Sequence, residues 1–154
     1  MFGLLAVLLV VSPPHFRAVP GWHVGTAGPA RACAYVSPTR CMQAVGWAST
    51  VRYRDCPNCI PPHRTLAHLP PGGIVIQLMY ARERPDRAQV GSWPPHIRAR
   101  DVSAGFEGEP DRYGVFQTFI RTGHLERSLF VWFGRPHPTR RQLARANAEL
   151  RTAA

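Results

Sequence analysis

The sequence predicts an α+β domain in which a four- or five-stranded, mainly antiparallel sheet is covered by a C-terminal helix. Three observations predict this fold. The run IVIQLMYARE, which begins at residue 74, is apolar on both faces, as a central strand requires. VFQTFIR and LERSLFVWF flank Thr122-Gly123-His124, which is a hairpin pattern. The ending PTRRQLARANAELRTAA carries apolar residues at helical spacing.

The composition predicts a single folded domain with a basic surface. The chain has 154 residues, of which 45% are hydrophobic, with four Trp, enough for one modest core. Its formal net charge is +10, and every basic side chain is an arginine. Guanidinium groups bind carboxylate or phosphate through a bidentate fork. One interpretation of this charge is a polyanionic partner, and the alternative is an ordinary soluble surface shaped by biased codons.

The N-terminus predicts export. Residues 2–11 contain no polar side chain and are followed by Ser12-Pro13-Pro14. This length suits the apolar region of a secretory signal and is short for a membrane span. We therefore expect residues 1–14 to be a signal peptide or short membrane anchor, 15–32 a Pro- and Gly-rich linker, and 33–154 the domain. A cut after Ala30-Arg31-Ala32 would lie too far from the apolar run, and the alternative for 2–11 is a core element.

The remaining elements follow in chain order. MQAVGWASTVRYR, residues 42–54, alternates and suits a strand, and RTLAHL suits a short helical turn. HIRARDV, residues 96–102, suits an edge strand with its arginines facing water. GFEGEPDRYG suits a loop. The terminal helix begins at Thr139, which stands in capping-box spacing with Gln142, and its apolar stripe consists of Leu143, Ala146, Asn147 and Leu150.

Cys56 and Cys59 form a Cys-x-x-Cys motif that suits a turn better than a helix start. Pro61 and Pro62 follow closely, and each disfavours helical conformation in the residue before it. Pro57-Asn58 favours the centre of a β-turn, whose ends lie within about 7 Å, a separation that a disulfide tolerates. The same geometry suits a zinc knuckle. That alternative takes its metal ligands from Cys33, Cys41, Cys56, Cys59 and His63.

An even number of cysteines behind an export signal favours two disulfides. Three pairings are open, and we favour Cys33–Cys41 with Cys56–Cys59 because both close short loops. A further alternative is thiol–disulfide exchange at Cys56 and Cys59, although a redox centre of that type places its first cysteine at a helix N-terminus.

Catalytic motifs for hydrolases, phosphate-binding loops and metalloproteases are not found in the sequence, and we expect no cofactor. Glu107, Glu109 and Asp111 cluster in a hydrated loop. A small basic ribonuclease using such acids with arginines and His124 or His137 is an alternative that no spacing selects. The aromatic residues suit core packing better than base stacking; they are Phe116, Phe119, Phe130, Trp132 and Phe133.

Two runs, LPPGGIVIQLMYARERP and FVWFGRPHPTRRQLARANAELRTA, resemble segments of small exported proteins of actinobacterial type that have no assigned function. The resemblance covers residues 33–153, loosely in the middle. It implies an exported α+β domain and supplies no catalytic residue.

The sequence therefore predicts an extracytoplasmic, non-catalytic accessory or binding domain at the cell envelope. Its partner is expected to be anionic lipid or an envelope polymer, with nucleic acid less favoured and a protein partner unspecified. The alternatives are thiol–disulfide exchange and a zinc-stabilised nucleic-acid-binding protein. The predicted polyanion-binding surface consists of Arg140, Arg141, Arg145 and Arg151.

Overall fold

A computed structural model describes residues 14–27, 44–56, 59–81, 89–90, 92–106, 111–122 and 125–153. Most of the predicted leader, together with Cys33 and Cys41, lies outside these residues. The elements are β1 His23–Ala27, β2 Ala44–Ser49, α1 His63–Leu66, β3 Ile74–Ala81, β4 Gln89–Val90, a 3₁₀ turn Ala99–Asp101, β5 Ser103–Ala104, β6 Gly114–Thr122, β7 Leu125–Phe133 and α2 Arg140–Leu150.

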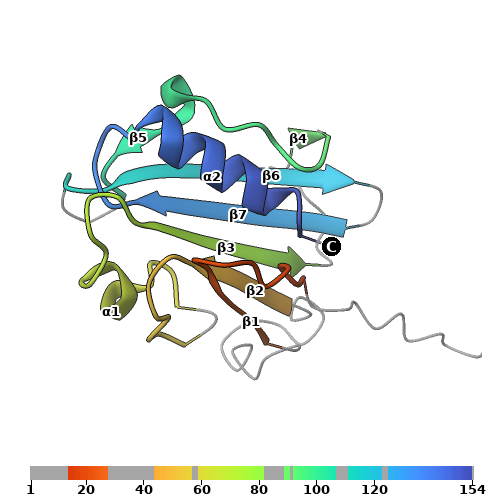
Figure 1. Ribbon diagram of the computed structural model, residues 1–154. Helices are drawn as coiled ribbons and strands as arrows, with labels where there is room; N and C mark the ends of the chain where they lie inside the picture. The colour runs from red at the N-terminus through yellow and green to blue at the C-terminus, as the bar shows by residue number, and fades with distance from the viewer. Residues whose placement is uncertain are drawn as a thin grey trace, which may run out of the picture.

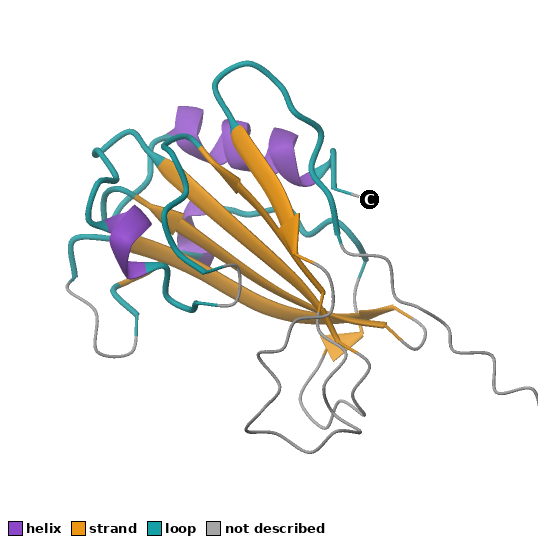
Figure 2. Ribbon diagram, turned by 90° about the horizontal axis from the view of Figure 1, so that it is seen from below, coloured by secondary structure: helices purple, strands orange, loops and turns teal. Residues whose placement is uncertain are grey.

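The α+β class is confirmed, and the strands form one sheet in the order β1-β2-β3-β7-β6-β4 (Figures 1 and 2). The five longer strands are antiparallel to their neighbours. β4 runs parallel to the end of β6, whereas β5 pairs antiparallel with its beginning. Within the described residues the sheet therefore has seven strands, not four or five. The strands that were not predicted are β1, β4 and β5. β4 and β5 have two residues each, too few for a periodic pattern.

The predicted central strand and hairpin are confirmed. β3 lies between β2 and β7, and β6 and β7 pair from Gly114↔Phe133 to Thr122↔Leu125. Side chains of β3 alternate between two cores, as the period of a strand requires. Ile74, Ile76 and Leu78 belong to one core, and Val75 belongs to the other. Both faces of β3 are thus buried, which explains its continuous apolar sequence.

Helix α2 covers one face of the sheet (Figure 1). Thr139 accepts a hydrogen bond from the amide of Gln142, and the Gln142 side chain accepts from the amide of Thr139, so the predicted capping box is confirmed. Ala146 and Leu150 are buried against the sheet. Asn147 is also buried. Its side-chain oxygen accepts a hydrogen bond from the amide of Ile97 at 2.8 Å, and its side-chain nitrogen donates to the carbonyl of Ile97 at 2.9 Å. The helix therefore holds the 92–98 segment as well as the sheet.

A second core covers the opposite face at the end where β3 begins. Leu66 and Leu69, from α1 and the turn after it, pack with Val75 and Trp132. Trp132 has no exposed surface, and its indole N–H has no hydrogen-bond partner. α1 starts at His63 and has a single turn, consistent with the short helix predicted there.

Two local predictions are wrong. The range 15–32, predicted as a linker, contains β1, and Phe16 is buried in the α2-side core. Gly25 of β1 permits this pairing because the ring of Trp47 occupies the place of a β-carbon there. The range 96–102 is not a strand. Asp101 accepts a hydrogen bond from the amide of Arg98 and so closes a 3₁₀ turn at Ala99–Asp101.

Candidate functional site

The Cys56-x-x-Cys59 motif forms a disulfide-closed turn. The Cα atoms lie 5.2 Å apart, and the amide of Cys59 donates to the carbonyl of Cys56 at 3.0 Å. The predicted Cys56–Cys59 disulfide is therefore present. Its companion Cys33–Cys41 falls outside the described residues. Helix α1 begins at His63, four residues after Cys59, so neither described sulfur sits at a helix N-terminus as a redox centre of the thioredoxin type would require.

The disulfide turn is tied to the centre of the sheet through Gln77. Gln77 is fully buried on β3, and its amide donates to the carbonyl of Cys59 at 3.0 Å and to the hydroxyl of Tyr53. The Tyr53 hydroxyl in turn donates to the carbonyl of Cys56 at 3.4 Å. Burial, with a smaller contribution from the charge of Asp55, raises the pKa of Tyr53. Tyr53 therefore stays neutral and serves as a hydrogen-bonding group.

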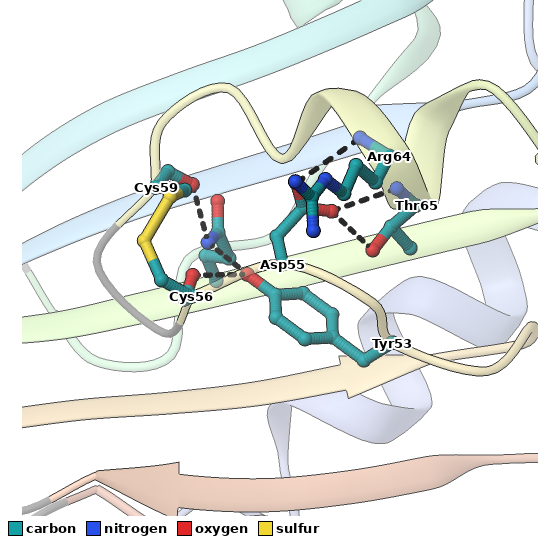
Figure 3. Close-up of a disulfide and its surroundings, with 7 residues drawn as sticks. Tyr53, Asp55, Cys56, Cys59, Arg64 and Thr65 are labelled. Atoms are coloured by element: carbon teal, nitrogen blue, oxygen red, sulfur yellow. Dashed lines mark hydrogen bonds between the residues drawn. A yellow bond between two sulfur atoms is a disulfide. The ribbon is translucent and has the colours of Figure 1, made fainter.

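Asp55 fastens the next part of the same segment by capping α1 (Figure 3). Its carboxylate accepts from the amide of Arg64 at 3.0 Å and from the amide of Thr65 at 2.7 Å. It also accepts from the hydroxyl of Thr65, which itself accepts from the amide of Arg54. All these polar groups stabilise the fold of residues 53–65. We therefore describe residues 53–65, with the disulfide, as the disulfide clip.

Within the described residues, no group of three or more His, Cys, Asp or Glu side chains lies close enough together to hold a metal ion. Cys56 and Cys59, two members of the alternative zinc set, are bonded to each other, and His63 is exposed at the start of α1. Of the acidic loop, Asp111 is exposed, whereas Glu107 and Glu109 lie outside the described residues. His137 is exposed, and His124 is outside them too.

The predicted arginine surface divides into two parts. Arg140 and Arg151 are exposed on α2 and its C-cap and lie outside the hollow that the other two line. Arg141 and Arg145 stand one turn apart on another side of the helix and share a hollow of about 230 Å³ with Arg135. Arg135 was missed because it lies outside the helical pattern, in the segment after β7.

This hollow, called the arginine hollow from here, forms where two distant turns meet. Besides the arginines, it is lined by Pro71 and Gly72 from the turn before β3 and by Thr139 and Gln142 at the start of α2. The Gln142 amide donates to the carbonyls of Pro71 at 3.0 Å and Gly73 at 3.3 Å, which ties α2 to the turn before β3. The amide of Gly134 donates to the carbonyl of Gly73 at 3.0 Å. A β-carbon on Gly134 would lie 1.8 Å from the carbonyl oxygen of Pro70, so only glycine allows this approach.

Arg145 is held in place by an aromatic ring. Its guanidinium carbon lies 5.4 Å from the ring centre of Trp22, within cation–π range. Gly21, at φ 85°, brings the backbone close to the same guanidinium. Arg100 and Asp101 form an ion pair at 4.0 Å, and no ion pair among the described residues involves Arg135, Arg141 or Arg145. No described carboxylate therefore neutralises Arg135, Arg141 or Arg145.

The aromatic side chains serve the core, as the sequence favours. Phe116 and Phe133 are buried under α2, whereas Phe130 and Trp132 stack at 5.6 Å on the opposite face, and Phe119 packs edge-on against Phe130. None of the described helices has the length and apolar character needed to cross a membrane.

Comparison with protein-family models, with curated proteins and with solved structures found no match to this chain. The resemblance in the LPPGG and PTRRQ segments therefore stays a prediction, although these two segments meet at the arginine hollow.

Proposed function

We propose that this chain is a non-catalytic binding domain that acts outside the cytoplasm, at the cell envelope, and binds an anionic lipid or polymer there. The observation that carries the proposal is the set of α2 arginines, which meet no described carboxylate. With a formal charge of +10, the chain attracts a polyanion at long range. Unpaired guanidinium groups then supply charge-assisted contacts to phosphate or carboxylate oxygens.

Vesicle binding tests this function. The full chain should bind vesicles that contain phosphatidylglycerol and should leave phosphatidylcholine vesicles unbound. Because each arginine near an anionic surface contributes about 1 kcal/mol, replacing Arg140, Arg141, Arg145 and Arg151 with Gln should weaken binding by roughly three orders of magnitude. The matched control removes the same charge elsewhere and should weaken binding much less; it replaces Arg17, Arg52, Arg54 and Arg64 with Gln.

Salt provides the decisive comparison. Binding through charge should fall steeply as salt rises from about 50 to about 500 mM. Binding that is unchanged over this range, or that is equal for the two sets of substitutions, would contradict the proposal. Fractionation of the native host, with a count of free thiols in the same preparation, tests the proposed location. A cytoplasmic protein with reduced cysteines would overturn it.

Thiol–disulfide exchange is a second candidate, favoured by the exposure of Cys56. Two features oppose it: the motif is not at a helix N-terminus, and both of its carbonyls are engaged by Tyr53 and Gln77. Insulin reduction with dithiothreitol, using Cys59→Ser as the control, decides between the two functions. Turnover by the native chain that is lost in Cys59→Ser would establish exchange.

A further inference from the structure

The arginine hollow has the chemistry of a discrete oxyanion site. Three guanidinium groups line it, from Arg135, Arg141 and Arg145, and no acidic side chain does. Thr139 and Gln142 add a hydroxyl and an amide to the lining. Three positive charges around one hollow match an anion that carries two charges better than one that carries a single charge. Arginine also favours phosphate geometrically, because its planar fork presents paired N–H donors to two oxygens.

The size of the hollow limits what can occupy it. At about 230 Å³, it falls below the roughly 300–1,000 Å³ typical of sites for drug-sized ligands. It accommodates a phosphate-sized group together with the first atoms of whatever carries that group. The hollow is open to the surface on α2 and the segment after β7, so the remainder of a larger ligand can extend into solvent.

Part of the lining is held in place before any ligand arrives. Gln142 anchors the helix to the carbonyls of Pro71 and Gly73, and Trp22 holds Arg145. Gly134 lets the segment that carries Arg135 press against the turn at Pro70. A preformed set of charges loses less side-chain entropy on binding than mobile surface arginines do. This distinguishes Arg145, which is half-buried, from Arg140 and Arg151, which are exposed on the same helix.

We propose that the arginine hollow binds the terminal phosphate of a phosphomonoester, with Arg135, Arg141 and Arg145 as its ligands. The inference rests on the proposed function and narrows it, from attraction of polyanions in general to recognition of one chemical group. The phosphomonoester can come from a soluble metabolite or from a lipid headgroup, and the experiment separates the two.

Titration calorimetry on the full chain uses inorganic phosphate and glycerol 3-phosphate as probes, with acetate for comparison. We expect saturable one-to-one binding of both phosphates and none of acetate. Arg141→Gln should weaken phosphate binding at least about tenfold, because a charge-assisted bidentate contact contributes more than one decade of affinity. Arg52→Gln, which removes the same charge at an exposed position outside the hollow, should leave it unchanged.

A second experiment, which measures binding to vesicles, identifies the source of the phosphate. Phosphatidic acid carries a phosphomonoester and phosphatidylglycerol a diester. A preference for phosphatidic acid that disappears in Arg141→Gln indicates a lipid ligand, and glycerol 3-phosphate binding without that preference indicates a soluble one. Both outcomes support the site. Binding of every anion alike, with equal losses in Arg52→Gln and Arg141→Gln, overturns the site but leaves the proposed function intact. Failure to bind phosphate and anionic vesicles alike overturns both.

Trp22 provides a test of the preformed geometry. Trp22→Leu removes the ring under Arg145 and should weaken phosphate binding several-fold. The control is Trp93→Leu, because Trp93 also contacts an arginine, Arg127 at 5.3 Å, but lies away from the hollow. Equal effects of the two substitutions on phosphate affinity would overturn the role of Trp22 as a positioning residue.

Discussion

The carboxylate of Asp55 caps α1 from outside the helix. It accepts hydrogen bonds from the amides of Arg64 and Thr65 and from the hydroxyl of Thr65. The Thr65 residue is fully buried. Asp55→Ala should lower the free energy of unfolding by about 2 kcal/mol, because it removes a helix cap and leaves buried donors without a partner. Urea denaturation measures the change. Asp111→Ala, at an exposed position, is the control and should change stability by less than about 0.5 kcal/mol. Equal effects would show that Asp55 does not fasten the helix.

Glu149 is a buried acid on α2, only 2% exposed. Burial raises the pKa of its carboxyl, and a hydrogen bond from Thr152 lowers it by a smaller amount. The folded chain therefore holds this proton at pH values where the unfolded chain has lost it. The contribution of Glu149 to stability is complete below its unfolded pKa, near 4.5, and is lost as pH rises through the folded pKa.

Glu149→Gln keeps the shape of the side chain and removes the free-energy cost of ionising a buried carboxyl group. The substitution should therefore stabilise the fold at about pH 7 and give a smaller gain at about pH 4. Urea denaturation at the two pH values measures the difference. Asp111→Asn is the control and should show no such pH-dependent gain. Stabilisation by Glu149→Gln that is equal at both pH values would contradict the assigned cause.

At the residue scale, the sequence reveals only partners that are close along the chain. The Thr139–Gln142 capping box is readable because its spacing is local. Asp55 with Thr65, Gln77 with Cys59, and Arg135 with Arg141 are brought together only by the fold. Of these contacts, the sequence signals only that of Gln77. It is a polar residue in an otherwise apolar strand, and a buried polar side chain requires a hydrogen-bond partner.

At the scale of elements, Gln142 joins the start of α2 to the turn before β3. Thr139→Ala removes only the cap and should cost about 1 kcal/mol. Gln142→Ala removes its half of the cap and both hydrogen bonds to the Pro71 and Gly73 carbonyls, so it should cost about 2–3 kcal/mol. Thermal or urea denaturation of the two variants measures this difference. Equal costs would mean that the contact between α2 and the turn contributes nothing to stability.

The disulfide clip should unfold more easily without its sulfur bridge. Because the closed loop is short, replacing Cys56 and Cys59 with Ser should lower the free energy of unfolding by only about 2 kcal/mol. Changes in amide hydrogen exchange should concentrate in residues 51–70 and at Gln77, and should spare α2, which packs on the opposite face. Loss of protection that begins in α2 would contradict this arrangement.

Elements with a strong local sequence pattern were predicted with their correct type: β3 from its continuous apolar run, the β6–β7 hairpin from its turn, and α2 from its cap and apolar stripe. Elements whose existence depends on a partner were missed. β1 consists of only five residues, HVGTA, and forms because β2 offers it an edge and because Trp47 covers Gly25. The 96–102 stretch alternates in sequence, yet Asn147 binds the backbone of Ile97 and a strand does not form.

At the scale of the molecule, the domain begins earlier than its composition indicates. Pro14 lies over Gly46, Phe16 is 5% exposed, and β1 completes the sheet. A chain that starts at residue 14 should therefore keep the full domain. A chain that starts at residue 28 lacks Phe16 and β1, and should lose at least about 3 kcal/mol, the typical cost of removing one buried Phe side chain.

Urea denaturation of the two shortened chains measures this loss, and the chain that starts at residue 14 is the control for removing the leader. Equal midpoints would show that residues 14–27 are the linker that their composition suggested. The expected loss also constrains export, because cleavage after Ala32 would remove β1 together with Trp22, which holds Arg145. Processing that preserves the domain and the arginine hollow must therefore cut the chain before Pro14.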